Sequence, residues 1–255
     1  MKRRSVIASC ALLSCLLSAC GGGGGGGGTT TTPTVPATPT ATAAQGLWTG
    51  TTSSRRALAA LVFDDGSYHL FYSGADSPTT VAGVIQGSGN GVDGAFASTD
   101  GRDFNLEGNG IRVTSVSGSV SAGQSFSGSL AGAETVTFNA GYDSASGNPA
   151  SLDSLAGHFD GRLASASGET LYVALDIASD GVLSGDGNGC VLGGRAQPHV
   201  GANAWDVTVA FSIETCPLAD QGFSGVAYVD AEGKLRLAAV NGERSDAVLF
   251  LGTRR

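Results

Sequence analysis

The residue types that most often carry catalysis are few in this sequence. Only three histidines occur among its 255 residues: His69, His158 and His199. They form no His-Glu-x-x-His pair of the kind that binds zinc, and no Gly-x-Ser-x-Gly segment marks a nucleophilic serine. We therefore assign the histidines structural roles and predict no catalytic residue, no metal site and no cofactor.

Two segments combine acidic residues with glycine, as calcium loops do. Residues 100–107 offer oxygen ligands, but their spacing departs from the EF-hand loop and no glutamate stands at the twelfth position. Residues 185–189 are similar to a calcium-binding nonapeptide repeat, yet a single copy cannot stack into that coil. We predict a hairpin turn at Asp100-Gly101 followed by a solvated strand, and a simple turn in residues 185–189.

Dispersed carboxylates leave one route to an enzyme open. A small hydrolase could use Asp64, Asp65 and Asp103, provided that they converge in a cleft and have perturbed pKa values. No sequence motif links these three residues.

The cysteines divide into two groups. Cys10, Cys15 and Cys20 lie in the first 20 residues, whereas Cys190 and Cys216 lie far along the chain. An even pair in an exported protein predicts a disulfide, which we assign to Cys190 and Cys216.

The first 20 residues have the layout of a bacterial export signal. A short basic start, Lys2 to Arg4, precedes an apolar stretch too short to span a bilayer. Leu17-Ser18-Ala19-Cys20 then resembles the lipobox of bacterial lipoproteins, in which small residues admit the processing peptidase and the cysteine thiol receives lipid. The resemblance implies a signal peptide at residues 1–19 and a lipidated Cys20, which two or three acyl chains would hold firmly on a membrane.

A spacer follows the predicted lipid attachment site. Eight glycines, residues 21–28, make a flexible coil, and the Thr- and Pro-rich residues that follow stiffen it. We assign residues 20–45 to this tether. Gly21 stands where some Gram-negative lipoproteins carry aspartate, and by that resemblance it implies sorting to the outer membrane, on either its periplasmic or its outer face.

Composition places the rest of the chain in the all-β class. The sequence has 41 glycines and one methionine, so turn formers are common and helix formers scarce. After loss of the leader, 22 acidic residues face 11 basic ones, a net charge of −11. This balance argues against a nucleic-acid partner.

The body contains an internal duplication. Three segment pairs recur in the same order: residues 46–50 with 157–161, 83–91 with 181–189, and 126–128 with 223–225. We predict two homologous units, residues 46–145 and 152–255, separated by a Ser-, Gly- and Pro-containing linker.

Each unit has the patterning of about eight short antiparallel strands. Apolar residues alternate with polar ones in residues 171–177 and 205–213, as in half-buried strands. Asp65-Gly66, Asp180-Gly181 and Glu232-Gly233 separate strand-like runs and favour tight hairpins. Eight such strands close into a barrel or pack as a sandwich, and we expect barrel-like units.

Each unit opens with a Gly-x-aromatic-x-Gly segment. Gly46 and Trp48 open the first, and Gly157 and Phe159 open the second. We expect the glycine to let the first strand bend and the aromatic ring to plug that end of the barrel. The segment resembles the Gly-x-Trp start of lipocalin and avidin-like barrels.

The layout as a whole suggests a binding role. A lipidated cysteine, a glycine-rich tether and a β-barrel body of small residues look like Gram-negative surface lipoproteins of the transferrin-binding and factor-H-binding type. The resemblance implies a non-catalytic binding module at the cell envelope, with an envelope or host protein or a glycan as partner besides the membrane. Tyr68 and Tyr72, if they face outward, and the Arg55-Arg56 pair are candidate contacts. A purely structural envelope protein is the other alternative.

Overall fold

The computed structural model describes residues 43–212 and 216–255, and in this part of the chain it is almost entirely β-structure. The predicted signal peptide, Cys20 and most of the tether lie outside the described residues. No helix in the described part is long and apolar enough to cross a bilayer.

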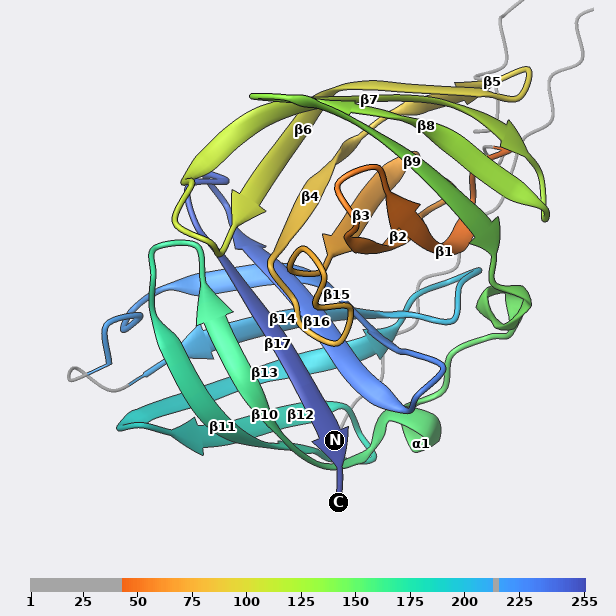
Figure 1. Ribbon diagram of the computed structural model, residues 1–255. Coiled ribbons are helices and arrows are strands. Elements are labelled where there is room, and N and C mark those ends of the chain that lie inside the picture. The colour runs from red at the N-terminus through yellow and green to blue at the C-terminus, as the bar shows by residue number, and fades with distance from the viewer. Residues whose placement is uncertain (1–42, 213–215) are drawn as a thin grey trace, which may run out of the picture. The chain divides into compact units, whose positions relative to one another are not determined.

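The first unit is an antiparallel barrel (Figure 1). Eight strands follow one another around it, and pairing of β4 with β6 closes the circle, while the short β5 pairs only with β6. The strands are β1 (Gly46–Thr52), β2 (Ala57–Val62), β3 (Ser67–Tyr72), β4 (Gly83–Ser88), β5 (Asn90–Val92), β6 (Ala95–Asn105), β7 (Ile111–Ser121), β8 (Ser125–Ala131) and β9 (Thr135–Tyr142).

The second unit is a closed eight-stranded antiparallel barrel. A 3-10 helix (Ser144–Gly147) and the short helix α1 (Leu152–Leu155) lead into it. Its strands are β10 (Gly157–Ser165), β11 (Thr170–Ile177), β12 (Val182–Gly187), β13 (Cys190–Pro198), β14 (Trp205–Phe211), β15 (Gly222–Val229), β16 (Lys234–Asn241) and β17 (Ala247–Arg254). The prediction of two eight-stranded all-β units is therefore confirmed, and both are barrels rather than sandwiches.

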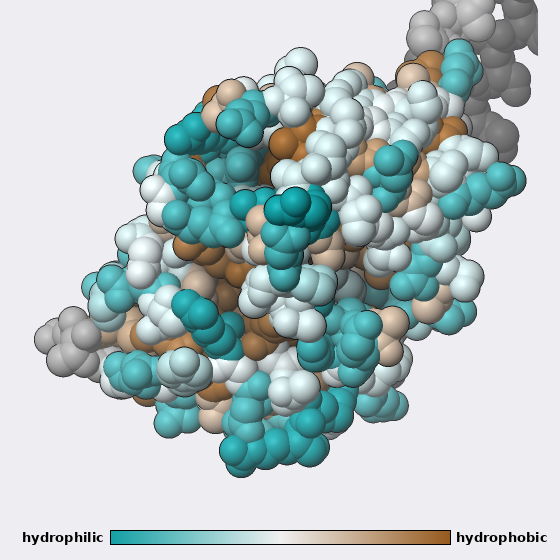
Figure 2. Space-filling view, viewed as in Figure 1, coloured by the Kyte–Doolittle hydropathy of each residue, from teal (hydrophilic) through white to brown (hydrophobic). Residues whose placement is uncertain are grey.

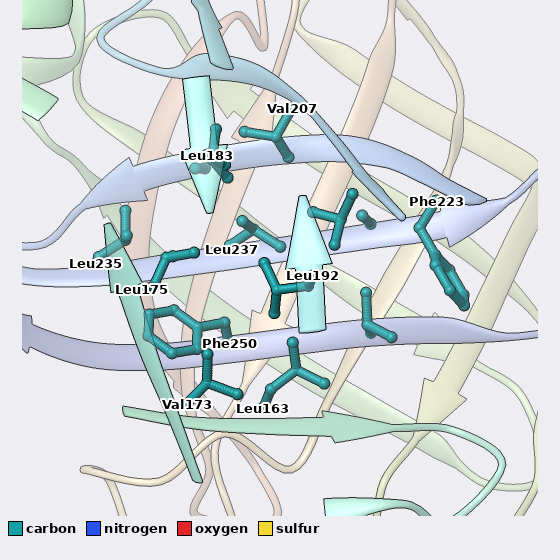
Figure 3. Packing of buried hydrophobic residues seen from close by; sticks show 14 of the residues in the cluster. Leu163, Val173, Leu175, Leu183, Leu192, Val207, Phe223, Leu235, Leu237 and Phe250 are labelled. Atoms are coloured by element: carbon teal, nitrogen blue, oxygen red, sulfur yellow. The ribbon is translucent and has the colours of Figure 1, made fainter. Parts of the chain in front are cut away.

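Strict alternation of side chains explains why these strands close. Along β14, every second residue from Trp205 to Phe211 is buried, and the residues between them are exposed. The inward side chains of the second barrel point toward one another and fill its interior (Figure 3). Burying one apolar face of each strand is the main force that holds such a barrel closed.

The opposite faces of several strands are polar. The outward positions of β7 and β8 are mostly serine, and the Ser117 and Ser129 hydroxyls lie 3.0 Å apart across these strands. On the face shown in Figure 2, hydrophilic residues and residues of intermediate hydropathy make up most of the surface, with hydrophobic residues mainly in recesses.

The opening glycines make room for a side chain from the last strand of each barrel. Gly46 and Gly157 both have positive φ, 130° and 149°. A Cβ atom on Gly46 would lie 2.4 Å from the Tyr142 ring, and one on Gly157 would lie 2.3 Å from Nη1 of Arg254. Tyr142 and Arg254 can therefore cover the aromatic plug only because these two positions lack a side chain.

The aromatic rings of the two opening segments, Trp48 and Phe159, are fixed by different contacts. Trp48 is fully buried, donates from Nε1 to the Ala44 carbonyl at 2.7 Å, and meets Tyr142 edge-to-face at 5.1 Å. Phe159 is also fully buried and lies under the Arg254 guanidinium, 4.6 Å from the ring centroid. Arg254 additionally donates to the Ser154 carbonyl at 2.7 Å, so one residue ties the last strand to the first strand and to α1.

The duplication is present, but two of the three predicted segment matches pair strands that occupy different positions in the two barrels. Residues 83–88 form the fourth strand of the first barrel, whereas residues 182–187 form the third strand of the second. The Phe126 and Phe223 segments are displaced by one strand in the same way. Only the opening segments, β1 and β10, occupy equivalent positions. Glycine-rich strands of similar composition recur in every part of such a barrel, so local likeness does not fix the strand number.

The turns agree with the sequence at three of four sites. Gly66, Gly181 and Gly233 have positive φ in tight turns between strands. The predicted hairpin at Asp100-Gly101 is wrong, because these residues lie inside β6, where the register with β7 shifts between Ser98 and Gly101. The shift is a β-bulge, for which a glycine is also suited. Residues 185–187 end β12, and only Asn188 and Gly189 form the turn.

The predicted disulfide is confirmed. Cys190 and Cys216 are bonded, with their Cα atoms 4.8 Å apart, and both side chains are buried among the core residues of the second barrel. The bond links the start of β13 to the segment before β15.

A further hydrophobic cluster contains side chains from both barrels. Leu61, Phe71 and Phe104 of the first barrel belong to the same buried cluster as Val226 and Leu249 of the second. These residues lie on the outward faces of their strands, so each barrel covers part of its outer surface with the other.

Candidate functional site

Two of the three histidines lie beside carboxylates, and the third is buried. His158 Nδ1 lies 2.7 Å from Asp176, and His199 Nδ1 lies 2.8 Å from Asp206. His69 is buried beside Phe63. Among the described residues, no group of three His, Cys, Asp or Glu side chains is arranged to hold a metal ion.

Tyr68 and Tyr72 do not present an outward aromatic face. Both side chains point into the first barrel and are only 2% and 8% exposed. Tyr68 lies toward the plugged end, where its ring meets Phe96 edge-to-face at 5.8 Å. Tyr72 lies at the other end of β3 and lines a cavity there, so it stays a candidate contact from inside the barrel.

Each of these tyrosines lies across from a glycine of β4. Tyr72 pairs with Gly83 and Tyr68 pairs with Gly87. A Cβ atom on Gly83 would lie only 2.1 Å from the Tyr72 hydroxyl oxygen. The glycines of β4 thus provide the space that allows two large rings to enter a narrow barrel.

The unplugged end of the first barrel is hollow. The cavity has a volume of about 350 Å³, within the range of small-molecule sites. Its wall combines polar and charged residues with a few aliphatic ones. They include Thr52, Arg56, Tyr72, Ile85, Asp103, Asn105, Asn109, Arg112, Thr114, Leu130, Glu134 and Val136.

A hydrogen-bond network fixes the polar wall of this cavity. The Tyr72 hydroxyl donates to Asp103 Oδ1 at 2.6 Å and accepts from Asn105 Nδ2 at 3.0 Å. Asn105 Oδ1 in turn accepts from the backbone N–H of Glu107 at 2.8 Å and from that of Asn109 at 3.2 Å. The network is anchored in backbone, so the Asp103 carboxylate is held in place before any ligand binds.

The two arginines of the β1–β2 connection differ in setting. Arg55 is exposed and pairs with Asp76 at 2.7 Å. Arg56 turns into the barrel mouth, where it makes two hydrogen bonds to Glu107, at 3.1 and 2.7 Å, and lies 5.5 Å from the Tyr72 ring centroid. Arg56 is therefore part of the cavity wall rather than a solvated loop tip.

Asp103 and Arg112 carry charges that no ion pair in the described residues satisfies. They are directly opposite each other on β6 and β7, yet no ion pair joins them. Asp103 instead accepts from Tyr72, and Arg112 Nε donates to the Asn109 carbonyl at 3.0 Å. Among the described residues, one oxygen of Asp103 and both terminal nitrogens of Arg112 have no hydrogen-bond partner.

Burial perturbs the ionisation of this wall. It raises the pKa of Asp103, against the opposing effects of the Tyr72 hydroxyl, Arg56 and Arg112. It also raises the pKa of Tyr72 far above its usual range, reinforced by the negative charge of Asp103. Tyr72 therefore keeps its proton and acts as a hydroxyl donor, whereas the Asp103 carboxylate takes up a proton more readily than an exposed aspartate does.

Gly83→Ala tests the link between fold and cavity. The new methyl group would collide with the Tyr72 hydroxyl and with the Phe104 carbonyl oxygen, 2.8 Å away, so Tyr72 must leave its place. We expect a loss of about 1–3 kcal/mol in the free energy of unfolding, measured by urea denaturation. Gly141→Ala, on β9 with nothing within 4 Å of its added Cβ, is the matched control. Equal stability of the two variants would contradict this packing.

The three aspartates of the hydrolase alternative do not converge. Asp65 lies in the β2–β3 turn, where it accepts from the Ser67 N–H at 2.8 Å, and Asp64 is its neighbour. Asp103 contacts Tyr72 at the far end of β3. The separation is roughly 17 Å, five residues of extended strand.

A second hollow, of about 610 Å³ and more open to solvent, lies on the outside of the second barrel. Gly161, Ala174, Gly252 and the exposed Tyr172 are among the residues that line it. Because it is an open face of the barrel, it offers little enclosure for a small ligand.

Sequence reasoning missed Asn105 and Arg112, and it read Asp103 as part of a solvated strand. The available signal was the alternation of side chains along a strand, which puts Asp103 and Asn105 on the face opposite Phe104. The β-bulge at Gly101 hid it, because it changes which face of β6 points inward.

Comparison with known proteins does not identify a family. No protein-family model matches the chain, and no curated protein matches it significantly.

Proposed function

We propose that this chain is a lipid-anchored binding protein of the bacterial cell envelope, and that the hollow mouth of its first barrel takes up a small polar ligand. The cavity around Tyr72, Asp103 and Arg112 is the observation that carries the proposal. Its polar groups are preorganised, and two of them have unused hydrogen-bonding capacity.

The contrast between the two barrels supports this choice. The interior of the second barrel is filled by leucine, valine and phenylalanine side chains, and it is tied by a disulfide and by Arg254 (Figure 3). The interior of the first is filled at the Trp48 end and open at the Tyr72 end. We assign the second barrel a supporting role and the first the binding role. A purely structural protein would not need a preorganised polar cavity.

The sequence supports the placement at the membrane. The Leu17–Cys20 segment, the glycine run and Gly21 together favour lipidation of Cys20 and sorting to the outer membrane.

Lipidation is tested by metabolic labelling. We expect radiolabelled palmitate to enter the wild-type protein and Cys20→Ser to abolish the label and release the protein from the membrane fraction. Cys15→Ser, within the leader, is the matched control and should keep the label. A membrane-bound, unlabelled wild type would refute the anchor.

Binding is tested on the full mature chain carrying Cys20→Ser. A collection of small amines, carboxylates, zwitterions and sugars is screened by backbone NMR. We expect the resonances of Tyr72, Asp103 and Arg112 to shift for at least one compound, and those of the filled second barrel to stay unchanged. Shifts confined to the second barrel, or none at all, would refute the proposed binding role.

A further inference from the structure

The charges of the first barrel's mouth specify the chemistry of its ligand. Arg56 is already neutralised by its two hydrogen bonds to Glu107. Glu134 lies on the exposed β8–β9 loop, where water screens its charge. The remaining charges are the partly buried Asp103 and the rim residue Arg112, one of each sign.

Asp103 and Arg112 are neighbours that do not neutralise each other. Directly opposed residues of antiparallel strands have Cβ atoms about 5 Å apart, close enough for an ion pair. The Tyr72 hydroxyl holds Asp103 on one side, and the Asn109 carbonyl holds Arg112 on the other. The mouth therefore presents a separated negative and positive group side by side.

The nearby wall adds an apolar surface. Ile85, Leu130 and Val136 line the same cavity as the two charges. The Tyr72 ring is less available, because the Arg56 guanidinium already lies over it. A ligand's cationic group would consequently find its partner in the Asp103 carboxylate rather than in an aromatic face.

We propose that the cavity recognises a zwitterion of the α-amino-acid class with an aliphatic side chain. Its ammonium group pairs with the free oxygen of Asp103, its carboxylate with the terminal nitrogens of Arg112, and its side chain packs on Ile85, Leu130 and Val136. This inference rests on the proposed binding role of the first barrel and names the ligand class. It accounts for why two opposite charges are held apart in a preorganised site.

Acid pH provides a signature of this arrangement. Because the pKa of Asp103 is raised by burial, its carboxylate takes up a proton earlier on acidification than an exposed aspartate does. The other groups that bear on its charge are Arg56, Arg112, Glu107 and Tyr72. Ligand affinity should therefore fall as the pH is lowered through this raised pKa, and Asp103→Asn should remove that dependence.

The test uses four probes in calorimetric titrations of the full mature chain carrying Cys20→Ser: leucine, leucinamide, N-acetyl-leucine and glycine. Leucinamide lacks the carboxylate, N-acetyl-leucine lacks the ammonium group, and glycine lacks the aliphatic side chain. We expect leucine to bind about tenfold more tightly than either singly charged analogue, since losing one charge-assisted pair weakens the affinity by about that factor. Glycine should bind more weakly than leucine.

Two variants and two controls assign the contacts. Asp103→Asn should make leucine and N-acetyl-leucine equal in affinity, and Arg112→Gln should make leucine and leucinamide equal. Asp93→Asn, in the β5–β6 turn, and Arg102→Gln, on the outer face of β6, should behave as wild type.

The outcomes separate the inference from the proposed function. If leucinamide or N-acetyl-leucine binds wild type as tightly as leucine, or if only compounds other than zwitterions shift the mouth resonances, the zwitterion inference is overturned and the binding role stands. If no compound of the screen binds the first barrel, both are overturned.

Discussion

Trp48→Ala is expected to reduce the free energy of unfolding by about 3–5 kcal/mol, the usual loss when a fully buried large aromatic is truncated. The indole fills the plugged end of the first barrel, with Phe126 at 5.8 Å and Tyr142 at 5.1 Å between ring centroids. Its removal also leaves the Ala44 carbonyl without its donor. Urea denaturation followed by circular dichroism measures the loss.

The chain provides both a control and a reporter. Tyr172→Ala removes an aromatic ring that is 73% exposed, so it should change stability by less than about 0.5 kcal/mol. In Trp48→Ala, Trp205 is the one remaining tryptophan, and it is buried in the second barrel, so its fluorescence follows that barrel alone. A Trp48→Ala protein as stable as Tyr172→Ala would show that this ring does not hold the barrel end together.

The fold could be predicted largely because barrel strands repeat a simple rule. Residues 205–211 alternate in the sequence, and the same residues alternate between buried and exposed in the structure. Asp65-Gly66 and Asp180-Gly181 mark turns because a glycine there adopts positive φ. Both signals are local, so they can be read without knowing what packs against them.

The cavity could not be predicted, because it depends on which face of a strand turns inward. Tyr68 and Tyr72 share a face under either orientation, and their direction is decided by Gly83 and Gly87 on the next strand, which make room for them. Asp103 and Arg112 are 9 positions apart in the sequence and become neighbours only through the register of β6 with β7. A bulge within β6 shifts that register, and no composition rule fixes where a bulge falls.

Acidification from pH 7 to pH 4 is expected to destabilise the wild-type protein by about 3 kcal/mol through one residue, His69. His69 lies on β3 with 7% of its surface exposed, and its Nδ1 has no hydrogen-bond partner in the described part of the chain. Burial, followed by the nearby charges of Arg244 and His199, lowers the pKa of His69 to about 4 from 6.5.

The folded protein loses stability on acidification because the folded and unfolded chains differ in proton uptake. Between pH 6.5 and 4 the unfolded chain protonates His69 and the folded chain does not, so the unfolded state gains protons and stability falls with pH. Asp65 and Asp100 have lowered pKa values, so their contributions are present above their unfolded value of 3.8 and are lost only below it. Asp103, whose pKa is raised, opposes the loss in part. Between pH 6.5 and 4, His69 is therefore the group whose protonation lowers stability, and Asp103 acts in the opposite direction.

His69→Gln distinguishes this mechanism from general acid unfolding, because a neutral side chain at that position cannot be protonated. Urea denaturation at pH 7, 6, 5 and 4 should show a steep decline for wild type and a much shallower one for His69→Gln. His158→Gln is the matched control, since Asp176 raises the pKa of His158. That contribution is complete below pH 6.5 and disappears as the pH rises through the raised pKa, so its removal leaves the acid decline intact. Parallel declines in wild type and His69→Gln would mean that His69 is not the group whose burial limits acid stability.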